Sequence, residues 1–160
     1  MDYQITKRGL YFLLLVVLSS SIVAAQDIND GIYFIIDDKK CLYNKVKIYG
    51  SRSSACIPDN PVLLFEDIDW LGELELDENT GTRELLMELS EKGSKILATI
   101  SEVYLGKKLA FVFKNEVVFV LLLDQVVNTG RISLVEKSKS TSLTEVREAI
   151  AEILERKEDP

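Results

Sequence analysis

Residues 107–125, KKLAFVFKNEVVFVLLLDQ, decide the fold of this chain. The polar triplet Lys114-Asn115-Glu116 interrupts the apolar run, so neither half is long enough to cross a membrane as a helix. A tight turn at the triplet would instead pair the two halves as the strands of a β-hairpin. Because both strands are almost continuously apolar, we expect at least one of them to lie in the centre of a sheet.

Further strands are predicted on both sides of this hairpin. They begin at Gly31 and at Lys45, run through the alternating stretch WLGELELDE at 70–78, and cover 131–136. In the third of these, Leu74 and Leu76 would face the core and the glutamates between them the solvent. Residues 51–61, SRSSACIPDNP, are rich in Ser, Pro and Asn and are interpreted as a loop.

Two helices are predicted. The first follows Thr80 and Thr82, and its apolar side chains recur at a helical period: Leu85, Leu86, Leu89, Leu97, Ile100 and Tyr104. Gly93 is expected to kink or divide this helix, and Gly106 to end it. The second helix opens with a capping box from Ser142 to Glu145, and its apolar face comprises Leu143, Val146, Ile150, Ile153 and Leu154.

The order from residue 70 is therefore strand, helix, strand, strand, strand, helix. This order indicates the α+β class: an antiparallel β-sheet with two main helices packed on one face, in a ferredoxin-like order. The predicted organisation has three parts, namely a leader at 1–25, an N-terminal strand and loop segment at 26–69, and an α+β domain at 70–157.

The leader has the layout of a secretory signal peptide. Lys7 and Arg8 precede the apolar run 10–18, and small residues follow up to Ala25. Cleavage is predicted between Ala25 and Gln26. The alternative is an uncleaved membrane anchor, but the 16 residues from 10 to 25 contain three serines and fall short of the roughly 20 that a spanning helix needs. The chain is thus expected to be exported, to the periplasm or the extracellular space.

The chain has two cysteines, Cys41 and Cys56. In an exported protein an even, small number of cysteines favours a disulfide, which here would close a loop of about 15 residues and stabilise the fold by about 3 kcal/mol. Two free thiols or a metal site are the alternatives. The chain contains no histidine, and two cysteines alone make a poor zinc site.

Composition narrows the functional classes. The net charge of −7 disfavours nucleic acid and anionic membrane surfaces as partners. Without histidine, Ser-His-Asp and Cys-His catalysis are closed. The acidic pairs Asp37-Asp38 and Asp67 with Asp69 lack the spacing of a calcium loop and are interpreted as solvated surface. The sequence DENTG from Asp77 is interpreted as helix capping. We therefore predict no catalytic residue, no metal ligand and no cofactor.

The lone tryptophan, Trp70, and nearby Phe65 could form a binding patch. Aromatic residues beside strands are more often part of the core, which is the interpretation favoured here. Exposure of more than about half of Trp70, beside other apolar side chains, would favour the binding interpretation instead.

The second half of the chain resembles a known family. The phrase ISEVYLGK at 100–107 runs into LAFVFKNEV at 109–117, and Thr129-Gly130-Arg131-Ile132 and Thr144-Glu145 follow. These phrases are similar in kind and spacing to the head subdomain of the first periplasmic domain of SecD, a protein-export translocase subunit. The similarity covers 70–157, although Phe119-Val120-Leu121 stands where the family has Ser-Ala-Pro. It implies the SecD head fold, and not the translocase activity, which requires membrane helices that couple proton flow to movement.

Three functions remain open. The resemblance and the export signal favour a non-catalytic protein that binds a polypeptide or an envelope protein, as an accessory in the cell envelope. The first alternative is a small secreted hydrolase, which would need two carboxyl groups in one cleft. The second is a purely structural or inhibitory secreted module.

Overall fold

The computed structural model describes residues 28–37, 40–136 and 143–158. The predicted signal peptide with its cleavage point at Ala25 and Gln26, Asp38, and the capping residue Ser142 lie outside these residues. Among the described helices, neither is long and apolar enough to cross a membrane.

A six-stranded sheet holds the central hairpin. Its strand order is β3-β2-β8-β7-β1-β4, and every neighbouring pair is antiparallel except β2 with β8. The strands are β1 (Gly31–Phe34), β2 (Asn44–Ile48), β3 (Ser54–Ile57), β4 (Leu63–Leu64), β7 (Lys108–Phe113) and β8 (Glu116–Leu122). The predicted hairpin is confirmed: Lys114 and Asn115 join β7 to β8, and both have positive φ, as a two-residue type I′ turn requires.

A second sheet of three antiparallel strands has the order β5-β6-β9. Its strands are β5 (Ile68–Asp77), β6 (Thr82–Leu89) and β9 (Arg131–Val135). A short 3-10 turn, η1 (Phe65–Asp67), carries the chain from β4 into β5. The strands of 31–64 therefore pair with β7 and β8 from the second half of the chain, and the domain division predicted at residue 69 stays a prediction.

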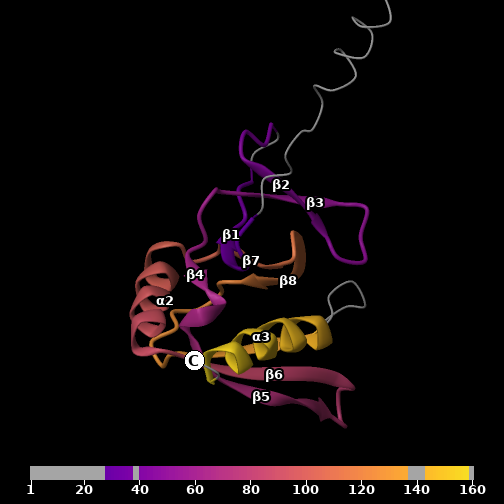
Figure 1. Cartoon of the computed structure of the whole chain (residues 1–160), viewed down its shortest axis with the longest axis vertical. Helices are drawn as coiled ribbons and strands as arrows, with labels where there is room; N and C mark the ends of the chain where they lie inside the picture. The colour runs from indigo at the N-terminus through magenta and orange to yellow at the C-terminus, as the bar shows by residue number, and fades with distance from the viewer. Residues whose placement is uncertain (1–27, 38–39, 137–142, 159–160) are drawn as a thin grey trace, which may run out of the picture.

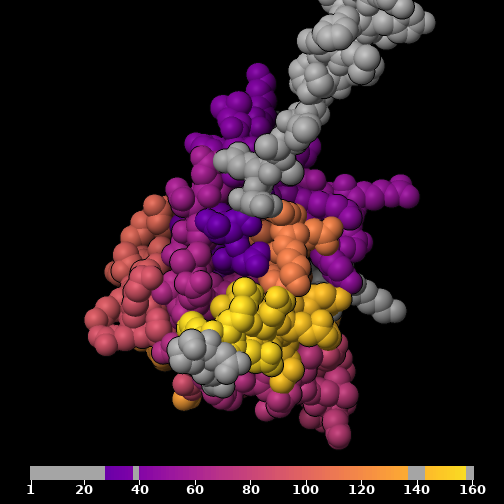
Figure 2. All heavy atoms as spheres, in the orientation of Figure 1, coloured from indigo at the N-terminus to yellow at the C-terminus, as the bar shows by residue number. Residues whose placement is uncertain are grey.

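The two helices are α2 (Glu91–Val103) and α3 (Leu143–Glu158). Figure 1 shows α3 between the two sheets, with β5 and β6 on one side and β7 and β8 on the other, while α2 lies at the side of the molecule. In the space-filling view α3 fills the space between the layers on this face (Figure 2). Its apolar face is buried as predicted, with Leu143, Val146, Ala149 and Ile150 fully inaccessible.

The α+β class with two helices and a SecD head-like arrangement is confirmed, with the strands divided between two sheets. The first predicted helix begins too early, because residues 82–89 form β6. There Leu85, Met87 and Leu89 are buried at a period of two, and α2 starts only after Ser90, whose hydroxyl accepts a hydrogen bond from the Gly93 amide at 3.1 Å. Gly93 thus lies in the first turn of α2.

The predicted loop at 51–61 contains a strand, which is a second correction. Strand β3 pairs with β2, and its Ala55 and Ile57 complete a small core with Tyr33 and Val46. The structure joins Cys41 to Cys56 in a disulfide, with 5.6 Å between the Cα atoms. This link fastens the turn before β2 to the outermost strand of the six-stranded sheet.

Candidate functional site

A groove of about 770 Å³ lies between the end of β8 and strand β9. Residues 119–122 of β8 form one wall, residues 131–133 and 135 of β9 form the other, and the connecting segment 123–129 closes one end. The lining is largely aliphatic. Leu122 and Val126 are 49% and 51% exposed, which is unusual for side chains of this size. We call this feature the β8–β9 groove.

The free edge of β9 faces this groove. The pairs Leu89 with Gly130 and Arg83 with Glu136 are hydrogen-bonded, so by the alternation of an antiparallel ladder Ile132 and Leu134 also bond to β6. The main-chain groups of Arg131, Ser133 and Val135 then point away from β6. In the part of the chain that the structure describes, β9 pairs with no other strand. The Arg131 amide has a long contact of 3.4 Å to the Thr129 hydroxyl.

The second half of β8 has a free edge of the same kind. Strand β2 pairs with β8 only at Glu116 and Val117, and so leaves 119–122 uncovered on that side. Because the Leu123 amide donates to the Lys107 carbonyl at 2.9 Å, the alternation turns the main chain of Val120 away from β7. The groove thus has unpaired main-chain donors and acceptors on both walls.

The apolar surface continues beyond the groove onto the end of α2. The hydroxyl of Ser101, a buried residue, accepts a hydrogen bond from the Val127 amide at 2.9 Å, and the Gly106 amide donates to the Leu123 carbonyl at 2.6 Å. These bonds hold the groove's end segment against α2. Next to them are three exposed apolar side chains, Val103, Tyr104 and Leu105.

Each of the other sheet edges has main-chain groups that are engaged within the protein. On β3, the Cys56 carbonyl accepts a hydrogen bond from the Ile36 amide at 2.8 Å. On the two-residue strand β4, the Leu64 amide donates to the Asp67 carboxylate at 3.2 Å. On β5, Arg147 and Lys157 of α3 donate to main-chain carbonyls. On β9 and on residues 119–122 of β8, by contrast, the outward main-chain groups face the β8–β9 groove.

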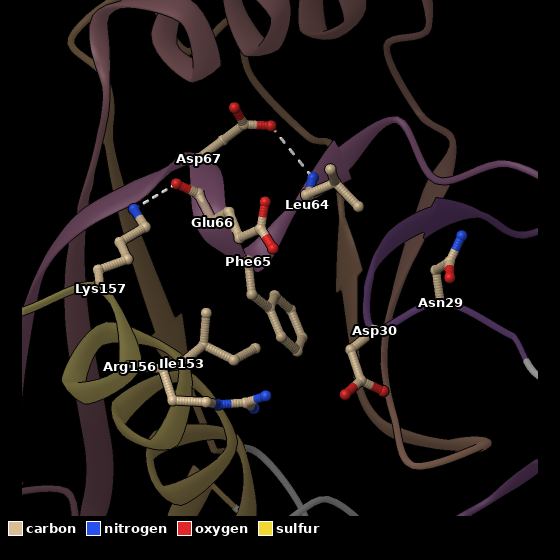
Figure 3. A pocket seen from close by; sticks show the side chains of 9 residues that line it. All are labelled: Asn29, Asp30, Leu64, Phe65, Glu66, Asp67, Ile153, Arg156 and Lys157. Atoms are coloured by element: carbon tan, nitrogen blue, oxygen red, sulfur yellow. Dashed lines mark hydrogen bonds between the residues drawn. The ribbon is translucent and has the colours of Figure 1, made fainter. Parts of the chain in front are cut away.

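A second hollow, of about 700 Å³, lies where η1 meets the end of α3 (Figure 3). Its polar groups are largely engaged within the protein. Asp67 accepts from Leu64 and forms an ion pair with Lys92 at 2.8 Å, while the Lys157 ammonium donates to the carbonyls of Glu66 and Ile68. These contacts seal the junction between the two sheets, so we interpret this hollow as a structural seam.

The acidic pair Asp67 and Asp69 does not form the solvated face that the sequence predicted. Asp67 is buried because it closes η1 and holds Lys92 of α2, whereas Asp69 is exposed. Asp37 lies outside both hollows. Asp77 is the last residue of β5, where its carboxylate accepts from Thr80 and Asn79 of the following turn, and it does not cap a helix. Among the described residues no cluster of three potential metal ligands occurs.

The two aromatic residues that the sequence singled out differ in burial. Phe65 is fully buried and stacks with Phe111 at a ring separation of 6.3 Å, as the core interpretation predicted. Trp70 is 49% exposed on the outer face of the three-stranded sheet, so the core interpretation was wrong for it. The main-chain edges of the groove were not anticipated, because strand register is not visible in one sequence.

The shifted acid–base groups lie outside the groove. Burial raises the pKa of Tyr33, and Asp30 adds to the effect. The hydrogen bond to Glu145 raises the pKa of Tyr49, and the hydrogen bond from Thr80 lowers the pKa of Asp77. Catalytic sites typically gather such groups in one cleft. The β8–β9 groove instead offers main-chain hydrogen bonding and apolar contact.

Comparison with protein-family models gives no match, and comparison with curated protein sequences gives none either. Solved structures do match. A structure described as that of SecDF, a membrane component that enhances protein export, superposes with a TM-score of 0.52 at 13% identity, over 96% of this chain and 70% of that one. SecDF in its super-membrane-facing form matches with a TM-score of 0.48 at 20% identity; that match covers 62% of this chain and only 12% of the SecDF chain. The described chain therefore resembles SecDF in fold, as its sequence phrases implied.

Proposed function

We propose that this chain is an exported, non-catalytic protein that binds an extended polypeptide in the β8–β9 groove. The observation that carries the proposal is that the outward main-chain edge of β9, which pairs with no other described strand, faces an apolar groove. An extended peptide can add to such an edge as a strand, with main-chain hydrogen bonds giving affinity and side-chain pockets giving specificity. The fold likeness to SecDF supports a role of this kind in the cell envelope.

The groove also suggests which peptides would bind. Side chains on alternate positions of an added strand would point into the aliphatic lining around Leu121 and Ile132, and those between them would face solvent. A peptide that alternates apolar and small polar residues satisfies both sides. Asp124 at the groove's end and Arg131 on its wall are exposed and of opposite sign, so charge selection there is expected to be weak.

Amide hydrogen exchange tests the binding mode directly. The probe is a soluble peptide that alternates Val and Thr. We expect the amides of Ser133, Val135 and Val120 to gain protection when the peptide is added, because they point into the groove. The amides of Ile132 and Leu134 are already bonded to β6 and should change little. Protection that appears only on other strands would contradict the proposal.

A pair of variants tests the apolar contact. Leu122→Asp and Val126→Asp place a charge on the groove wall at positions that are already half exposed, so the fold should tolerate them. We expect each to weaken binding of the same peptide by about tenfold or more, equivalent to about 1.4 kcal/mol. Leu42→Asp is the matched control, because Leu42 is 83% exposed in the segment next to the disulfide. Equal affinity for all three variants would count against the groove.

The hydrolase alternative has one observation in its favour: the second hollow brings the carboxyl groups of Asp30, Glu66 and Asp67 to one region (Figure 3). Asp67, however, uses both oxygens on Leu64 and Lys92, and Asp30 accepts the Lys114 amide at 2.7 Å. The pairing of these carboxylates with internal donors favours a structural role. Turnover of a glycan that is abolished by Asp30→Asn or Glu66→Gln would reverse this preference.

A further inference from the structure

The outer face of the three-stranded sheet carries a second surface, distinct from the groove. Helix α3 packs on the inner face, where Leu74, Leu85 and Met87 join the core. The outer face presents Trp70 and Leu86 together with three glutamates, Glu75, Glu84 and Glu88. We call these five residues the Trp70 face. Among the described elements none packs extensively over it.

The Trp70 ring packs over Gly72, which has no side chain to displace it. A Cβ atom added to Gly72 would lie 3.0 Å from Cη2 of the Trp70 ring and 3.2 Å from the Leu86 carbonyl. Any larger side chain would therefore lift the indole from the sheet. Half of Trp70 remains exposed, and Leu86 beside it is also exposed, so the two form an apolar platform on a surface strand pair.

The carboxylates around this platform are only partly neutralised. Glu75 is directly opposite Glu84 in the β5–β6 register, and like charges directly opposite one another destabilise a sheet. Glu84 receives a hydrogen bond from the Ser133 hydroxyl, which carries no charge. Glu88, opposite Trp70, forms an ion pair with Arg131 at 2.6 Å. Among the described residues, neither Glu75 nor Glu84 forms an ion pair.

We propose that the Trp70 face binds a basic, apolar segment of another polypeptide. A Lys or Arg side chain of that segment would lie between Glu75 and Glu84 and relieve their repulsion, and its apolar neighbours would cover Trp70 and Leu86. A second cation can stack over the indole ring, the best cation–π acceptor among side chains. Self-association through this face is disfavoured, because it would bring the same three glutamates of each copy together in a chain of net charge −7.

The test uses a synthetic peptide that alternates Lys and Leu, and a counterpart that alternates Glu and Leu. Trp70 is the only tryptophan, so its fluorescence reports contact at this face directly. We expect the Lys peptide to shift the emission and to lose affinity as salt is raised, and the Glu peptide to do neither. The double variant Glu75→Gln with Glu84→Gln should weaken Lys-peptide binding about tenfold or more.

The matched control is Glu102→Gln with Glu155→Gln, which removes the same charge from exposed positions on the two helices. Equal loss of affinity in this control would show attraction to net charge alone and would overturn the proposal. Leu122→Asp should leave Lys-peptide binding unchanged, which separates this face from the groove. A concentration-dependent dimer that Trp70→Ala abolishes would also overturn it, in favour of a second copy as the occupant.

Thermal unfolding without any ligand tests whether Glu75 and Glu84 repel one another. If Glu75 and Glu84 repel one another, then Glu75→Gln alone should raise the thermal unfolding midpoint in low salt, and the rise should shrink as salt is added. Glu102→Gln is again the control. A fall in the midpoint for Glu75→Gln would show that the pair is not repulsive, and the binding proposal would lose its electrostatic basis.

Discussion

The two edges of the three-stranded sheet are treated differently. Along β5 the ladder is bulged between Leu71 and Leu74, and α3 supplies two cations to the strand's outward carbonyls. Arg147 Nε donates to the Gly72 carbonyl at 3.3 Å, and Lys157 Nζ donates to the Ile68 carbonyl at 3.0 Å. Along β9 the ladder is regular from Arg131 to Val135, and the described helices supply no such side chain.

This difference fits the proposal that β9, and not β5, is the edge that binds another chain. Bulges and inward-reaching lysines are common devices that stop strands from pairing with other chains. Both devices occur on β5. The edge of β9 is regular and uncovered, and it lies next to the exposed side chains of Leu122 and Val126. These features fit an edge that binds another chain.

The largest expected effect comes from proline on β9. Ile132→Pro should destabilise the protein by at least about 3 kcal/mol, because it removes both a buried side chain and a bond to β6. Ser133→Pro removes an amide that points into the groove, so it should cost only about 1 kcal/mol. Its main effect should be loss of binding of the Val–Thr peptide. Urea denaturation and peptide titration measure the two quantities.

Ile132→Ala is the control that separates the side chain from the main chain. The excess destabilisation of Ile132→Pro over Ile132→Ala reports the lost bond to β6. If Ser133→Pro were as destabilising as Ile132→Pro, the assignment of outward and inward amides on β9 would be wrong, and the groove would lose its main-chain edge.

Some elements of the fold could be predicted from the sequence. The hairpin of β7 and β8 was recognisable because three polar residues interrupt an apolar run that is otherwise too long for one strand. The apolar face of α3 was recognisable from a regular 3.6 period. Both signals are local, and tertiary contacts reinforce them.

The edges themselves could not be predicted. Leu85, Leu86 and Leu89 fit a helical period, whereas burial of Leu85, Met87 and Leu89 against α3 and the core selects a strand. Once β6 is misassigned, the sheet that contains β5 and β9 disappears from the prediction. Asp67 was likewise placed on a solvated strand, because its ion pair with Lys92 joins residues that are 25 positions apart.

Arg147→Ala should remove part of the cover on β5. The Arg147 side chain is about one third exposed and also pairs with Glu73 at 2.6 Å, so the expected destabilisation is only about 1 kcal/mol. The more informative result is association: an uncovered β5 should raise the tendency to dimerise at high concentration. Sedimentation measures the association, and urea denaturation measures the loss of stability. Arg52→Ala, on an exposed loop, is the control, and identical sedimentation of the two variants would contradict a protective role for Arg147.

The smallest expected effect concerns pH and the turn that joins β5 to β6. The Thr80 hydroxyl donates to Asp77 at 2.7 Å and the Asn79 amide at 2.9 Å, and the hydrogen bond from Thr80 is the main reason that the pKa of Asp77 lies below its ordinary value of 3.8. Because the folded pKa is lowered, this carboxylate stabilises the fold above pH 3.8 and the contribution is lost as the pH falls through the folded value. The group is fully exposed, so only a slight change in the acid limb of the unfolding midpoint is expected, and Asp77→Asn should abolish it.

Since the turn connects β5 to β6 and does not touch β9, acid should increase exchange at the β5 and β6 amides beside the turn and leave the protection of Ile132 unchanged. Equal acid sensitivity of both edges would show that they open together, and the contrast between a covered and a binding edge would then be one of side chains alone.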